Sequence, residues 1–215
     1  MGSWLRPFSL SAFTALLCAG FSAAADLDSA RRAYQQKDYA TAFQESTVLA
    51  GQGNSDAQVI LGKMYLMGQG VIKDPDQAIK WFKASAAQGN ADAQFFLGSF
   101  YLLPRRDIAE GLKWLRLSAE QGQQDAQYLL GKAYLQGDKE LPHDPVQAEM
   151  WLRLAAKGNL GFYQNELVGA EKQMTAGQIA KGKALAEAWK PKPGLKPEEK
   201  PAHDEKAGAD GKAGF

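Results

Sequence analysis

Side chains that commonly perform catalysis or bind metals are scarce in this chain. Its 215 residues include two histidines, His143 and His203, and one cysteine, Cys18. The sequence has no His-Glu-x-x-His run and no group of cysteines and histidines with the spacing of a zinc site. Neither histidine stands in a pattern that predicts a nucleophile paired with its base. We therefore expect no catalytic residue, no cofactor and no metal, and a protein that is not an enzyme.

Two other patterns could indicate a substrate site, and each has a simpler explanation. The segment Gly68-Gln69-Gly70 is not followed by the further glycine and helix of a dinucleotide-binding loop. A glycoside hydrolase needs two carboxylates that flank one bond. Asp74, Asp107 and Asp144 instead stand where acidic side chains cap helices.

The most basic short segment of the chain is YLLPRRD, residues 101–107, in which Arg105 and Arg106 follow a proline. Such a pair could contact nucleic acid. The whole chain, however, has 25 Lys plus Arg against 24 Asp plus Glu, so no net positive charge attracts a polyanion. We expect no nucleic-acid partner and keep the two arginines as a candidate edge contact for a protein.

An internal repeat predicts the elements that position these residues. Residues 53–88, 89–121 and 122–157 align as three copies, with lengths of 36, 33 and 36 residues. Each copy has a Leu-Gly pair, a tyrosine and a tryptophan at matching places. These positions are Leu61, Leu97 and Leu130, Gly62, Gly98 and Gly131, Tyr65, Tyr101 and Tyr134, and Trp81, Trp114 and Trp151. The second copy has lost part of its central loop, and the two arginines lie in what remains.

Each copy has the pattern of two antiparallel helices. The repeated glycine falls inside the first helix, where glycine costs about 1 kcal/mol relative to alanine, so it predicts a close approach of the second helix. The Asp-Pro pairs at Asp74 and Asp144 predict the starts of second helices. Stacked copies bury the apolar stripes that one pair cannot bury alone. The predicted fold is therefore all-α, a right-handed α/α solenoid.

The rest of the chain is expected to provide the ends of this solenoid. Residues 26–52 predict an N-terminal helix pair of the tetratricopeptide type. Residues 158–189 predict half a repeat and a capping helix, with Ile179, Leu185 and Trp189 as the apolar contacts of that helix. Residues 190–215 are rich in proline, glycine and charge and predict a disordered tail.

Residues 1–25 have the pattern of a signal peptide. Arg6 precedes the uncharged apolar segment 7–21, and Ala23 and Ala25 form a small-residue cleavage site. A retained membrane anchor and lipidation of Cys18 are the alternatives, although Leu17 stands where lipoprotein signals normally have a small residue. We expect a periplasmic or secreted protein that is cleaved near Ala25, is not embedded in the membrane and has no cysteine left.

The repeat pattern resembles the Sel1-like repeat family, a relative of tetratricopeptide repeats, and the chain looks like a secreted bacterial member. The first copy has nearly the whole family pattern: Ala57, Leu61, Gly62, Tyr65, Gly68, Gly70, Val71, Asp74, Ala78, Trp81, Ala86 and Ala87. The resemblance implies a scaffold or adaptor for protein–protein interaction in the assembly or regulation of a cell-envelope system, with an unknown envelope protein as partner.

The resemblance leaves an alternative open, in which the protein binds glycan or peptidoglycan or assists an envelope enzyme. One cysteine-rich branch of the family has been linked to β-lactam binding. That implication does not carry over, because this chain lacks the repeat cysteines.

By analogy with tetratricopeptide repeats, the first helix of each pair is expected to line the concave side. Its exposed positions are the candidate partner-binding residues Val59, Lys63, Phe95, Ser99, Tyr128 and Lys132. The alternative is that these side chains pack between neighbouring first helices. A base also recurs two residues after each tryptophan, at Lys83, Arg116 and Arg153, where we expect a solvated convex face.

Overall fold

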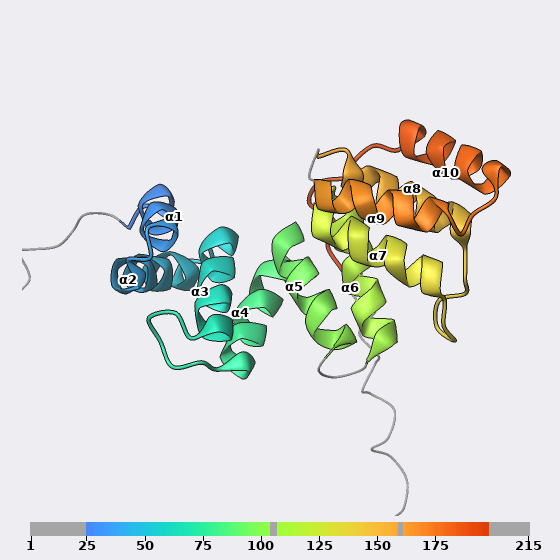
Figure 1. Ribbon diagram of the computed structural model, residues 1–215. Helices are drawn as coiled ribbons and strands as arrows, with labels where there is room; N and C mark the ends of the chain where they lie inside the picture. Colours follow the sequence, from blue (N-terminus) through green and yellow to red (C-terminus); the bar gives the residue numbers. More distant parts are fainter. Residues whose placement is uncertain (1–24, 104–106, 159–160, 198–215) are drawn as a thin grey trace, which may run out of the picture.

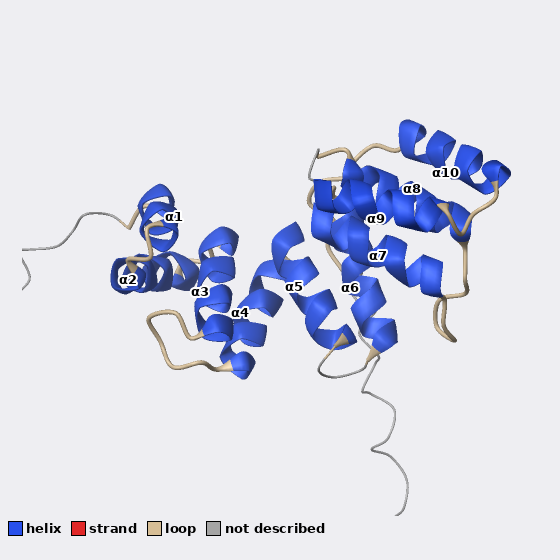
Figure 2. Ribbon diagram, in the orientation of Figure 1, coloured by secondary structure: helices blue, strands red, loops and turns tan. Residues whose placement is uncertain are grey.

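The computed structural model describes residues 25–103, 107–158 and 161–197. Within these ranges the chain forms ten helices and no strand (Figure 2). Their bounds are α1 Leu27–Gln35, α2 Tyr39–Gly51, α3 Ser55–Met67, α4 Pro75–Ala87, α5 Ala91–Leu102, α6 Ile108–Glu120, α7 Gln124–Gln136, α8 Pro145–Ala156, α9 Gly161–Glu171 and α10 Ala176–Ala188. Across the described residues, none of the helices has the length and apolarity to cross a membrane.

The helices follow one another along the array in chain order (Figure 1). The pairs α3 and α4, α5 and α6, and α7 and α8 are the three repeats, and each first helix also packs against the second helix of the preceding repeat. Helices α1 and α2 form the N-terminal pair, and α8 contacts both α9 and α10. The expected all-α solenoid is therefore confirmed.

The repeated glycine packs where its partner helix comes closest. A Cβ atom at Gly62 would lie 2.4 Å from the Phe82 ring, and one at Gly98 would lie 2.7 Å from Leu115 Cγ. At Gly131 the nearest atoms are Leu152 Cγ at 2.8 Å and the Leu152 backbone nitrogen at 3.0 Å. A side chain at any of these positions would push the two helices of a repeat apart.

The helix starts and the repeat junctions also follow the expectation from sequence. Side chains at Asn54, Asn90, Asp74, Asp107 and Asp144 accept hydrogen bonds from backbone N–H groups in the first turn of the helix that follows. Asp107 thus caps α6 although the loop before it is shortened. Between repeats the chain turns at left-handed glycines, Gly53, Gly89 and Gly122, with φ of 90°, 91° and 96°.

The capping helix α10 packs differently from the expectation. Its buried residues are Gly182 and Ala186, whereas Leu185 is 41% exposed. A Cβ atom at Gly182 would lie 2.4 Å from the Glu149 side chain, so α10 lies too close to α8 for large side chains between them. Leu185 is therefore not an apolar contact of this helix. Trp189 is, because its ring meets that of Trp151 edge to face, with centroids 6.3 Å apart.

The sequence predicted disorder from Lys190 onward, and this prediction is wrong for residues 190–197. This segment leaves α10 and returns along the array, where the Lys192 N–H donates to the Glu120 carbonyl at 2.8 Å. The Gly194 N–H donates to Gln121 Oε1 at 2.7 Å. Residues 1–24, 104–106 and 198–215, with the expected signal peptide, Arg105, Arg106 and most of the expected tail, lie outside the described part of the chain.

The packing of the helical glycines predicts opposite effects of two glycine-to-alanine changes. Gly131→Ala should lower the free energy of unfolding by about 1–3 kcal/mol, because its Cβ meets the backbone of α8. Gly169→Ala, in the exposed last turn of α9 with nothing within 4 Å, should raise it by about 0.5 kcal/mol. Urea unfolding followed by circular dichroism measures both. Equal effects of the two changes would contradict this packing.

Candidate functional site

The candidate residues on α3 do not form an open surface. Val59 is only 5% exposed and lies in a buried cluster with Phe82 and Leu97, so its expected exposure is wrong. Lys63 is half-buried, with its ammonium 5.2 Å from the centroid of the Phe96 ring. Both side chains therefore face neighbouring helices: Val59 lies among residues of α4 and α5, and Lys63 lies over a ring of α5.

The candidate residues on α5 are half-buried rather than exposed. Phe95 packs against the core of the third repeat. Ser99 lines an apolar cavity of about 210 Å³ with Phe82, Phe96 and Phe100, and its hydroxyl is buried. A buried hydroxyl in an apolar cavity does not by itself select a ligand.

The candidate residues on α7 are engaged by α9. Tyr128 donates its hydroxyl hydrogen to Glu166 Oε2 at 3.1 Å, and Lys132 Nζ lies 3.0 Å from the same oxygen. The Lys132 hydrogen bond holds the pKa of Glu166 below its usual value, while burial and Glu166 raise the pKa of Tyr128. These side chains tie the half repeat to the third repeat, as the packing alternative proposed.

A second contact holds α9 in the same way. The Tyr163 hydroxyl donates to Asp125, in the first turn of α7. Burial and this hydrogen bond raise the pKa of Tyr163 to about 12, so the phenol stays protonated at neutral pH. The contact is therefore a structural one and provides no acid or base for catalysis.

The described residues include one fully buried carboxylate, Glu149 of α8. Its Oε1 accepts from Arg153 Nε at 2.7 Å, and Arg153 Nη2 also lies 2.6 Å from Glu171 Oε1. Burial raises the pKa of Glu149, and Arg153 opposes this only in part. Arg153 is thus used internally and does not belong to the solvated face that we expected for it.

The part of the chain that the structure describes contains no metal-binding cluster. No three side chains of His, Cys, Asp and Glu come together there in a way that could hold a metal ion. His143 lies in the loop before α8, with Nδ1 2.7 Å from the Leu135 carbonyl oxygen. No nucleophile pairs with this ring among the described contacts, so the structure offers no acid–base site at His143.

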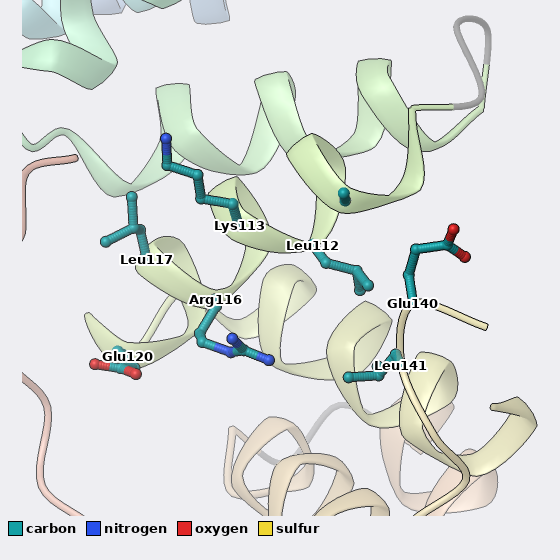
Figure 3. Close-up of a pocket in the computed structure, with 8 residues that line it drawn as sticks. Leu112, Lys113, Arg116, Leu117, Glu120, Glu140 and Leu141 are labelled. Carbon is teal, nitrogen blue, oxygen red and sulfur yellow. The ribbon is translucent and has the colours of Figure 1, made fainter. Parts of the chain in front are cut away.

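A groove with charged residues at its edge lies between α6 and the loop after α7 (Figure 3). It has a volume of about 530 Å³. Lys113, Arg116, Leu117 and Glu120 extend from α6, and Glu140 and Leu141 come from the loop (Figure 3). The remaining lining residues are Ala109 and Leu112. We call this the α6 groove.

The loop wall of the α6 groove is fixed by a turn at Asp138. Its carboxylate accepts from the N–H groups of Glu140 and Leu141 at 2.9 and 2.7 Å, and Leu141 is buried. Arg116 is exposed and its guanidinium lies 3.3 Å from the Tyr134 hydroxyl. The groove therefore combines an apolar floor with two cations and two carboxylates at its rim.

Comparison with known proteins agrees with the repeat pattern. A model of the Sel1 repeat matches residues 55–90, 91–123 and 124–160. The chain belongs to the Sel1 repeat family. The matched segments begin two residues later than the copies predicted from the sequence. Each matched segment therefore begins at the start of a first helix.

Two solved structures show the same fold. A Sel1 repeat protein from Oxalobacter formigenes is 28% identical, with 66% of this chain and 59% of that chain covered and a TM-score of 0.61. The protein c5321, a protective antigen of uropathogenic Escherichia coli strains with an SLR fold, is 30% identical, with 71% and 34% covered and a TM-score of 0.59. The chain thus spans 59% and 34% of the lengths of these two proteins, less than two thirds in both cases. A search of curated proteins found no match.

Sel1 repeat proteins generally mediate protein–protein interaction and are generally not catalytic. Sequence reasoning did not find the α6 groove. The recurrence of a base two residues after each tryptophan singled out Arg116, but only the fold shows that a loop of the third repeat lies beside it.

The buried Glu149 predicts a change of stability with pH that a neutral variant lacks. Because its pKa is raised in the folded protein, ionising Glu149 costs more in the fold than in the unfolded chain. The stability of wild type relative to Glu149→Gln should therefore fall as pH rises from the usual Glu range through the raised pKa. Thermal unfolding at a series of pH values measures this difference.

Glu187→Gln on the exposed side of α10 is the matched control, and its difference from wild type should change little over the same range. A gain of wild-type stability over Glu149→Gln on raising the pH would show that Arg153 outweighs burial at this carboxylate.

Proposed function

We propose that this chain is a non-catalytic scaffold of the bacterial cell envelope that binds a protein partner at the α6 groove. The support for a protein partner is the family, whose members generally act through protein–protein contacts. The support for the envelope is the signal-peptide pattern of residues 1–25. Export and the partner are parts of this proposal.

The observation that carries the proposal is the chemistry of the α6 groove. Its floor is aliphatic, from Leu112, Leu117 and Leu141, and Arg116 stands exposed at its rim. Apolar floors with an arginine are typical of residues that dominate binding energy at protein interfaces. Among the described residues, no aromatic ring lines the groove on which a sugar could stack, so the groove favours a protein segment over a glycan.

The mixed charges of the rim also indicate the kind of segment. Lys113 and Arg116 lie one turn apart on α6, and Glu120 follows one further turn along the same face. An amphipathic helix that places apolar residues on the floor and an acid beside Arg116 would satisfy this arrangement. Charge reversal at Arg116 should then weaken binding by about tenfold or more, since it replaces an attraction by a repulsion.

A photo-crosslinking amino acid at Lys113 in the full-length chain, expressed in bacterial cells, tests this proposal. We expect a covalent adduct with a protein in the periplasmic fraction, and a strong loss of this adduct when Arg116→Glu is added. The matched control places the crosslinker at Lys183, an exposed residue of α10.

Three results would contradict the proposal: equal adducts at both positions, an adduct that Arg116→Glu leaves unchanged, or a chain found only in the cytoplasm. Sedimentation of the protein with isolated peptidoglycan, again dependent on Arg116, would favour the glycan-binding alternative.

A further inference from the structure

Each junction between two repeats is built around a buried glutamine from a first helix. Gln58 Nε2 donates to the Ala50 carbonyl at 3.3 Å, Gln94 Nε2 to that of Ala86 at 3.4 Å, and Gln127 Nε2 to that of Ala119 at 3.2 Å. These three glutamines are at most 5% exposed. They lie on α3, α5 and α7 at equal places in the repeat, so they form a regular row along the array.

A second glutamine, at the end of the second helix, joins this row. Gln88 Nε2 donates to Gln58 Oε1 at 2.9 Å, and Gln121 Nε2 donates to Gln94 Oε1 at 2.7 Å. Each such pair stands beside a left-handed glycine, Gly89 or Gly122. We call the row of glutamine pairs and junction glycines the junction track.

The segment after α10 binds the junction track through main-chain atoms. Gly194 donates its N–H to Gln121 Oε1 at 2.7 Å, and the Leu195 carbonyl accepts from Gln94 Nε2 at 2.6 Å. The Lys192 N–H donates to the Glu120 carbonyl at 2.8 Å. The Lys192 ammonium also lies 3.2 Å from the Glu120 carboxylate, but this pair is exposed and adds little. The track therefore recognises main-chain groups more than particular side chains.

Residues of the segment contact successive junction glycines at a regular spacing. A Cβ atom at Gly122 would lie 3.7 Å from Pro191, and one at Gly89 would lie 2.8 Å from the Gly194 carbonyl oxygen. Pro191 and Gly194 are three residues apart, so the segment advances three residues from one junction glycine to the next. Residues 193–194 form a turn on the way, with Gly194 at a φ of 74°.

The next place on the track is the junction formed by Gly53, Gln58 and Gln88. A Cβ atom at Gly53 would meet nothing within 4 Å among the described residues, so the space above this junction is open there. In the three-residue register, the residue that follows Gly194 on the track is Pro197. Proline has no N–H to donate to Gln88 as Gly194 donates to Gln121. The chain's own segment thus matches the second junction and not the first.

We propose that the junction track is a binding site for a peptide segment of a partner protein, and that residues 190–197 occupy it as an internal competitor. The inference rests on the proposed scaffold function and names a second surface and the chemistry of its ligand. A suitable partner segment turns as residues 193–194 do, has a small residue or glycine where it crosses a junction, and offers an N–H every third residue. Such a segment binds the first junction as well as the second.

The covalent link gives the internal segment an advantage over any free peptide. A tethered segment acts at an effective concentration of the order of millimolar. In wild type it should therefore block the junction track against a peptide at micromolar concentration. Replacing Lys192 and Gly194 by proline removes both N–H donors. It also excludes the φ of 74° that Gly194 adopts. This double variant should release the segment while it leaves every repeat residue unchanged.

The experiment uses the full chain and fluorescein-labelled synthetic peptides, with binding measured by fluorescence anisotropy. The first peptide has the sequence of residues 190–200, KPKPGLKPEEK, and the second is the same peptide with Pro197→Gly. The released variant, Lys192→Pro with Gly194→Pro, should bind the first peptide at least tenfold more tightly than wild type does. Lys196→Ala, an exposed change in the same segment, should bind like wild type.

The second peptide tests the register. It should bind the released variant about three- to tenfold more tightly than the first peptide, because one more hydrogen bond forms at the first junction. Gln88→Ala should abolish this gain, and Gln121→Ala should weaken both peptides.

Equal binding by wild type and the released variant would overturn the inference, and so would a second peptide that is no tighter than the first. Gly194→Pro alone is the reserve variant if the double variant does not show the helical circular dichroism of wild type. If the peptides do not bind but the Lys113 adduct still forms, the proposal of the junction track is wrong and the proposed scaffold function stands. The reverse result would keep the junction track and remove the α6 groove as a partner site.

Discussion

The contact between a helical glycine and the side chain of its partner helix is the constraint on which the rest of this structure depends. Gly62, Gly98 and Gly131 let the second helix of each repeat come close enough that a single methyl group would not fit. Because the two helices lie equally close in each repeat, successive repeats are also equally spaced. The buried glutamines of successive junctions therefore recur at one repeat length, and a single chain segment can follow them from one junction to the next.

Most of the fold could be predicted from the sequence, because its signals are local and repeated. Capping residues such as Asp74 and Asn90, the glycine turns and the apolar stripes each act within one repeat, and three copies support one another. The side-chain exposure of first helices could not be predicted in the same way. Val59 is buried among side chains of α4 and α5, such as Phe82 and Leu97, and this depends on how successive repeats rotate.

The C-terminal part shows a second limit of sequence reasoning. Composition predicted disorder from Lys190 because the segment has few large apolar side chains. Residues 190–197 are held mainly by their main-chain atoms, which composition does not report, on acceptors and donors that the repeats provide. Leu185 is the opposite case, because the sequence predicted it as an apolar contact. Close packing at Gly182 instead leaves this large side chain outside the interface with α8. The α6 groove likewise required a loop of one repeat to fold beside a helix of another.

Glu120 connects the two surfaces that the structure offers to a partner. Its side chain lines the α6 groove, and its carbonyl accepts the N–H of Lys192 on the junction track. A partner could therefore bind the groove with one segment and displace residues 190–197 with another. Binding at two places through one short connection strengthens the whole contact without any new interaction.

Hydrogen–deuterium exchange of the full-length chain tests most directly whether the junction track binds a backbone. The account predicts that the amides of Lys192 and Gly194 exchange far more slowly than those of an unstructured peptide of the same sequence. It also predicts that an excess of the peptide with Pro197→Gly raises their exchange rate. Exchange of both amides at the unstructured rate, with the repeats protected, would contradict it.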